Sequence, residues 1–163
     1  MKKAFAPLVN NKSKIIILGT MPGEKSLKLQ QYYGHSSNHF WKIIFALFEK
    51  KWSADYDQRK QLILENNLAL WDVLAYCERS GSADNNINNE TANDFEKFYK
   101  QYPQIKNVFF ASRQAEKYYD TLVIRKPGRI YYTLPSPSSA NAWKTLDEKI
   151  KDWKIIIRIL NNN

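Results

Sequence analysis

Two polar loops contain residues that could bind a ligand or take part in a reaction. The first reads GTMPG at positions 19–23, and the second reads LPSPSSANA at positions 134–142. Each follows a short apolar run, as a loop at the end of a buried strand does. Neither contains the lysine of a P-loop, and GTMPG lacks the glycine spacing that a dinucleotide pyrophosphate needs. A nucleotide-binding regulator is therefore the weakest interpretation of the chain, and a Pro-Gly turn alone is structurally ordinary.

Short apolar runs and helical periodicities indicate the elements that hold these loops. Strands are expected at residues 14–18, 68–71, 106–110 and 129–134. Helices are expected at residues 24–33, 40–48, 57–65, 72–78, from 95 to just before Pro103, 113–122 and 143–160. Residues 80–91 are polar and rich in turn formers, which predicts an exposed loop.

The order of these elements predicts the fold class. Strands that alternate with helices are typical of an α/β fold, here a three-layer sandwich in which helices flank a mainly parallel central sheet. Ligand sites in such folds lie beyond the carboxyl ends of the strands, where both polar loops fall. The chain has 163 residues, 44% of them hydrophobic, which suits one domain over residues 1–163.

The net charge and the cysteine content indicate which binding partner and which cellular compartment to expect. The formal net charge is +9, from 25 Lys and Arg against 16 Asp and Glu, which favours a polyanionic partner such as nucleic acid. Cys77 is the only cysteine, so no intrachain disulfide and no CxxC metal pair can form. The first residues lack the features of a secretion signal, and no apolar run approaches a membrane span of about 20 residues. We therefore expect a cytoplasmic protein with no metal, no cofactor and no membrane contact.

Five segments, taken in chain order, resemble the uracil-DNA glycosylase superfamily over about residues 14–143. They read GTMPG, YYGHSSNHFWKII, ALWDVL, ASRQAEKYY and LPSPSSANA. The hypoxanthine-DNA (deoxyinosine) glycosylases look most similar, since their first segment runs like GSFPGxxSxxxxQYYxHPRNxFW; mismatch-specific uracil glycosylases, with a GINPG turn, are also similar. The matching positions are Gly19, Pro22, Gly23, Ser26, Gln31, Tyr32, Tyr33, His35, Asn38, Phe40 and Trp41.

The resemblance implies a monofunctional enzyme that acts on double-stranded DNA as a monomer. Such an enzyme extrudes a damaged or mismatched base from the duplex and hydrolyses its N-glycosidic bond, leaving an abasic site. Hypoxanthine is the first expected substrate. Two alternatives stay open: a mismatch-specific uracil or thymine glycosylase, and a catalytically weak DNA-binding module on the same fold.

The family pattern assigns the central role to Asn38. Many superfamily members orient the attacking water with Asp or Asn at the third position of the first turn, where this chain has Met21. The resemblance therefore makes Asn38 the expected catalytic residue, although an Asn before an apolar run is also a common helix cap. Tyr33 is expected to stack on the extruded base, and Gly23 to leave room where uracil-specific members have a tyrosine.

The remaining site residues follow from the same resemblance. The expected base pocket comprises Gly19, Thr20, Met21, Pro22, Gly23, Tyr33, His35 and Ser112, and the expected DNA-binding loop comprises Pro135, Ser136, Pro137, Ser138, Ser139 and Asn141. Ser139 and Asn141 could instead cap the C-terminal helix.

Besides Met21, the chain departs from the family pattern in three further places. Ser36 and Ser37 replace the usual Pro-Arg pair, and Ala111 and Ser112 replace an Asn-Gly pair. Ser138 stands near the position of the residue that wedges into the duplex in relatives, and this small side chain is expected to fill the gap poorly. These departures are expected to affect DNA binding and base selectivity.

Overall fold

A four-stranded parallel sheet forms the centre of the protein. The computed structural model describes residues 1–162 and contains β2 (Ile15–Gly19), β3 (Leu68–Asp72), β6 (Asn107–Phe110) and β7 (Ile130–Thr133) in the order β3-β2-β6-β7. Gly19 pairs with Asp72, and Phe110 pairs with both Leu18 and Thr133, so the carboxyl ends of the strands meet at one edge. The predicted strands and their parallel arrangement are confirmed.

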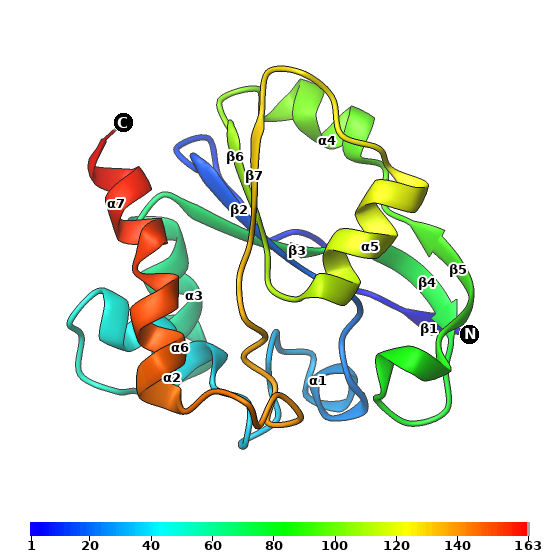
Figure 1. Cartoon of the computed structure of the whole chain (residues 1–163), viewed down its shortest axis with the longest axis horizontal. Helices are drawn as coiled ribbons and strands as arrows, with labels where there is room; N and C mark the ends of the chain where they lie inside the picture. Colours follow the sequence, from blue (N-terminus) through cyan, green and yellow to red (C-terminus); the bar gives the residue numbers. More distant parts are fainter. Residues whose placement is uncertain (163) are drawn as a thin grey trace.

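Helices cover both faces of this sheet because alternate side chains of each strand point to opposite sides. Ile15 and Ile17 belong to one buried cluster, whereas Ile16 and Leu18 belong to the other. Figure 1 shows α2 (Phe40–Leu47), α3 (Tyr56–Glu65), α6 (Leu146–Trp153) and α7 (Ile155–Asn161) on one side and α4 (Phe95–Gln101) and α5 (Arg113–Leu122) on the other. The three-layer α/β sandwich is confirmed.

A second, antiparallel sheet corrects the prediction for residues 72–91. Residues 74–78 were expected to be helical but form β4 (Leu74–Glu78), which pairs with β1 (Lys2–Lys3) and β5 (Asn88–Ala92). Pairing on both edges overrides the local helical pattern. The expected exposed loop is therefore shorter, since a 3₁₀ turn (Asp84–Asn86) and β5 occupy its second half.

Two predicted helices have different ends in the structure. Helix α1 (Glu24–Leu29) stops early because Gln30 takes a left-handed conformation with φ of 54°. The expected C-terminal helix is two helices that meet at Lys154, and it begins after Trp143, at the Thr145–Glu148 capping box. Thr145 is thus the cap, and the alternative that Ser139 or Asn141 caps this helix is wrong.

No helix within residues 1–162 is long and apolar enough to cross a membrane.

Candidate active site

One cavity of about 710 Å³ brings together the segments that were predicted from the sequence. It lies at the carboxyl ends of β2, β3 and β6, where an α/β fold places its ligands. Its lining includes Asn38 and every expected base-pocket residue: Gly19, Thr20, Met21, Pro22, Gly23, Tyr33, His35 and Ser112. Ser136, Pro137, Ser138, Ser139 and Asn141 line it as well, whereas Pro135 does not; the Pro135 carbonyl instead accepts from Trp153 Nε1 at 2.9 Å.

Asp72 lines the cavity and was missed by the sequence analysis. It is the last residue of β3, is only 5% exposed, and sits beside Gly19 in the sheet. Burial, together with the negative charge of Asp84, raises the pKa of Asp72 to about 7, against the opposing effect of the Arg79 cation. The carboxyl group therefore holds its proton in part of the molecules at neutral pH. Its position directly after a buried strand was the sequence signal that could have found it.

Three polar atoms of the cavity lining are buried without a hydrogen-bond partner among residues 1–162. They are Oδ2 of Asp72, the hydroxyl of Tyr33 and the hydroxyl of Thr20. The Thr20 hydroxyl makes no hydrogen bond of ordinary geometry, although the Asp84 carboxylate is near enough to interact with it. Buried polar groups are rarely left unpaired, so a cluster of them in one cavity suits a polar ligand.

Gly19 is needed for this cluster to form. A Cβ atom at position 19 would lie 2.6 Å from Oδ1 of Asp72 and 3.1 Å from the hydroxyl of Tyr33. The first distance is far below van der Waals contact. The glycine thus allows the carboxyl and the phenol to approach the backbone from two different elements.

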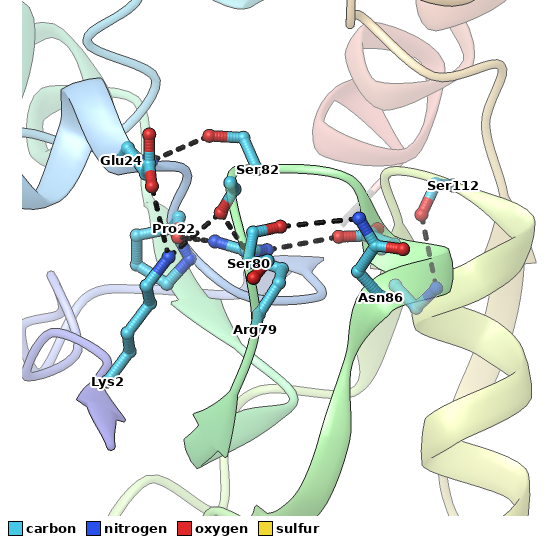
Figure 2. A network of polar contacts seen from close by, with 11 residues as sticks. Lys2, Pro22, Glu24, Arg79, Ser80, Ser82, Asn86 and Ser112 are labelled. Carbon is cyan, nitrogen blue, oxygen red and sulfur yellow. Dashed lines mark hydrogen bonds and ion pairs between the residues drawn. The ribbon is translucent and has the colours of Figure 1, made fainter.

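A buried arginine fixes the segment of residues 80–86, of which residues 82–85 form one wall of the cavity (Figure 2). The Arg79 side chain is fully buried; it donates to the carbonyl of Pro22, to that of Gly81 at 3.1 Å, and to Asp84 at 3.3 Å. Two further contacts join this wall to other segments: Lys2 Nζ donates to the Gly81 carbonyl at 2.8 Å, and the Glu24 amide donates to Ser82 Oγ at 2.8 Å. These links hold the wall against the GTMPG turn.

Asn38 precedes His39, which is the N-cap residue of α2, so the alternative that Asn38 is the helix cap is wrong. Oδ1 of Asn38 accepts from the Phe40 amide at 2.8 Å. Because a backbone N–H donates to an acceptor, the Asn38 side-chain atom in this contact is the oxygen. The other terminal atom of the side chain is therefore the amide nitrogen. No hydrogen bond of that nitrogen is found within residues 1–162, and Asn38 lines the cavity. The contact with the Phe40 amide and a role in the cavity are thus compatible.

Tyr33 has a constrained position. Its φ of 53° lies in the left-handed region, which is unusual for a residue with a side chain. Its ring stacks on Phe40, with 3.9 Å between ring centres and 16° between planes. One ring face is therefore occupied, so the expected stacking on an extruded base stays a prediction for the opposite face.

The segment that replaces the family's Pro-Arg pair contacts the second loop. Ser37 Oγ lies 2.7 Å from His35 Nδ1 and 3.1 Å from Ser139 Oγ. Nearby, the buried Lys149 donates to the Ser138 carbonyl at 3.2 Å and lies 3.2 Å from His39 Nδ1. The two loops are therefore held together across the cavity rim.

The last sequence-predicted pocket residue, Ser112, caps a helix at the cavity edge. Its hydroxyl accepts from the Ala115 amide at 3.1 Å, which makes Ser112 the N-cap of α5.

In the part of the chain that the structure describes, no group of three or more His, Cys, Asp or Glu side chains is placed to hold a metal ion.

Comparisons with known proteins agree with this geometry. Residues 6–158 match the Uracil DNA glycosylase superfamily. Two proteins named hypoxanthine DNA glycosylase are each 31% identical: that of Methanosarcina acetivorans over 97% of this chain and 99% of its own length, and that of Methanosarcina barkeri over 93% and 95%. An NMR structure from M. acetivorans, whose name assigns it to the uracil DNA glycosylases, has a TM-score of 0.85 and 29% identity and covers 98% of both chains. The chain therefore belongs to the uracil DNA glycosylase superfamily.

Proposed function

We propose that this DNA glycosylase removes hypoxanthine from double-stranded DNA. The observation that carries the proposal is the cluster of unpaired polar atoms on Asp72, Thr20 and Tyr33 within a cavity of about 710 Å³. A purine with polar groups along its edge can satisfy such atoms, and the two relatives named hypoxanthine DNA glycosylase support this choice of base. The deoxyinosine nucleotide leaves the base stack and enters the cavity before the bond is hydrolysed.

Asp72 selects the base and assists its departure in this proposal. The pKa of Asp72, raised to about 7 by burial, leaves a proton on the carboxyl group that can be donated to O6 of hypoxanthine. Adenine presents an amino group at that position, so two donors would oppose each other and adenine would be rejected. As the glycosidic bond breaks, negative charge grows on the leaving base, and the same donor stabilises it.

Asn38 positions the attacking water. Its amide is oriented by the contact with the Phe40 amide, so it enters the reaction without having to reorganise. The Oδ1 atom has a second lone pair for the water, and the amide nitrogen can donate toward developing charge. Neither step needs a covalent bond to the enzyme, which supports a monofunctional hydrolase that leaves an abasic site.

The loop at residues 136–141 contacts the DNA backbone in this proposal. Its hydroxyl groups, together with a net charge of +9, suit phosphate binding and the release of counterions. All named groups come from one chain and line one cavity, which supports action as a monomer.

The test uses duplexes that each contain one lesion: deoxyinosine or deoxyuridine, opposite each of the four bases. We expect abasic sites, revealed by alkaline strand cleavage, in the deoxyinosine duplexes, and free hypoxanthine identified by mass spectrometry. Abasic sites only from deoxyuridine would reassign the substrate to uracil. Duplex binding without any abasic site would indicate a catalytically inactive binding module.

A further inference from the structure

A second cavity, of about 570 Å³, opens at the amino ends of the central strands. It is lined by three lysines, Lys12, Lys14 and Lys106, and by four residues with side-chain amides, and we call it the lysine cleft. Lys14 directly precedes β2, and Lys106 directly precedes β6. The candidate active site lies at the other end of the same strands. The five residues of β2 therefore separate the two cavities, by about 15 Å at roughly 3.3 Å per residue.

The lining of the lysine cleft is cationic and contains no acidic residue. Within residues 1–162, none of the three lysines forms an ion pair. Lys12 also borders a neighbouring cavity that includes Asp57 and Glu65, but both carboxylates have other partners. Asp57 pairs with Lys60 at 3.4 Å, and Glu65 accepts from Gln61 at 2.6 Å. Three unpaired cations around one concave surface create a positive potential that attracts anions.

A buried amide in the same cleft indicates a ligand with hydrogen-bond acceptors. Asn107 lines the cleft and is only 7% exposed. No hydrogen bond of its side chain is found in the part of the chain that the structure describes, residues 1–162. Buried polar groups are rarely left unpaired, and the amide nitrogen of Asn107 can donate to an anionic oxygen. Gln104 donates from Nε2 to the Asn11 carbonyl at 3.2 Å, which joins two segments of the cleft lining.

Phosphate groups are the anions that this lining suits. Lysine binds phosphate as a point charge, and amide N–H groups donate to phosphate oxygens. The cleft has no aromatic side chain on which a base could stack and no carboxylate that could accept from a base edge. It therefore matches the backbone of a nucleic acid rather than its bases. DNA is already the substrate of the chain, and the net charge of +9 attracts it to the whole molecule.

We propose that the lysine cleft binds the phosphate backbone of a second DNA segment while the candidate active site holds the first. The two cavities lie at opposite edges of the sheet, so one straight duplex does not reach both. A chain that contacts two segments can pass from one to the other without leaving DNA, which shortens the search for a rare lesion. The proposal does not depend on which base the active site removes.

Energy transfer between two short undamaged duplexes, one carrying a donor dye and the other an acceptor, tests the proposal. Transfer requires that one protein molecule holds both duplexes, and base excision does not enter the measurement. We expect transfer in the wild type, with a Kd for the second duplex on the order of 1–100 µM, as is typical of nonspecific binding. The combined variant Lys12→Gln, Lys14→Gln and Lys106→Gln should weaken this second binding by at least about tenfold. Excision from a single short duplex should be unchanged in this variant.

The combined variant Lys97→Gln, Lys117→Gln and Lys126→Gln is the matched control. These lysines are exposed and line neither the lysine cleft nor the candidate active site, and the variant has the same net charge as the cleft variant. Transfer should be retained in it. An equal loss in both variants would mean that net charge alone holds the second duplex, and undiminished transfer in the cleft variant would exclude the cleft; either result would overturn the proposal.

Inorganic tripolyphosphate distinguishes a DNA backbone from a free polyphosphate as the source of the phosphate groups. In the wild type it should displace the second duplex and abolish energy transfer, because both ligands use the same lysines. If calorimetry shows binding of tripolyphosphate that the cleft variant loses, but the wild type gives no energy transfer between duplexes, the cleft binds free polyphosphate and the assignment to DNA is wrong.

Discussion

Replacing Asp72 by Asn should make the protein more stable at alkaline pH. The pKa of this carboxyl is raised from its usual 3.8 to about 7, first by burial and then by the Asp84 charge. Between these two values the folded chain holds a proton that the unfolded chain has released. The contribution of Asp72 to stability is therefore highest below about pH 4, falls as pH rises toward 7, and stays low above 7.

The size of this effect follows from the interval between the two pKa values of Asp72. About three pH units at 1.36 kcal/mol each amount to at most about 4 kcal/mol of lost stability at pH 8. Asparagine has nearly the same shape and no charge, so Asp72→Asn removes this loss. The variant should equal the wild type near pH 4 and exceed it by about 2–4 kcal/mol at pH 8.

Urea unfolding at several pH values between 4 and 8, followed by circular dichroism, measures this difference. Asp57→Asn serves as a control because the Asp57 side chain is 90% exposed, and its effect should stay within about 0.5 kcal/mol. Parallel loss of stability with pH in the wild type and in Asp72→Asn would refute the reasoning. It would mean that Asp72 is ionised in the folded protein throughout the range.

Three further predictions concern the site and its partner. Asn38→Ala should lose about 1 kcal/mol of stability with the hydrogen bond from the Phe40 amide but about a hundredfold in single-turnover excision. Asn38→Asp should keep that hydrogen bond, and if Asn38→Ala excises at the wild-type rate, Asn38 has only a structural role. Arg79→Met should destabilise the fold by about 2–4 kcal/mol in urea unfolding, because the Pro22 and Gly81 carbonyls lose their buried donor; a smaller loss of unfolding free energy than that caused by Lys97→Met, at an exposed position, would argue against this role. Affinity for undamaged duplex, measured by fluorescence anisotropy, should fall by at least about tenfold between 50 and 200 mM salt, and a flat profile would exclude binding dominated by phosphate contacts.

The central sheet could be predicted because its strands are short and mostly apolar. Ile15–Gly19 is buried at every position, and such runs between polar loops have few other stable arrangements. The segment after Asp72 could not be predicted in the same way. Leu74–Glu78 becomes a strand through pairing with residues at the start of the chain and with β5, and no local pattern contains those partners.

The residues of the candidate site also differ in whether the sequence alone could predict them. Residues of the GTMPG turn, Asn38 and the second loop were found because they form continuous family motifs, and the cavity brings them together. Asp72 and Arg79 were missed because each depends on distant contacts. Burial changes the protonation of Asp72, and Arg79 reaches the carbonyl of Pro22, which is distant from it in the sequence.

The way in which Arg79 holds the cavity wall has a consequence for how substrate preference can evolve. Two of its acceptors are backbone carbonyls, so these anchors do not depend on the identity of the side chains at positions 22 and 81. Substitutions at the exposed positions Ala83 and Asn85 can therefore alter what the wall presents to a ligand while its backbone keeps its place. Libraries confined to these two positions, with Arg79 and Ser82 retained, are a practical route to glycosylases with altered lesion preference.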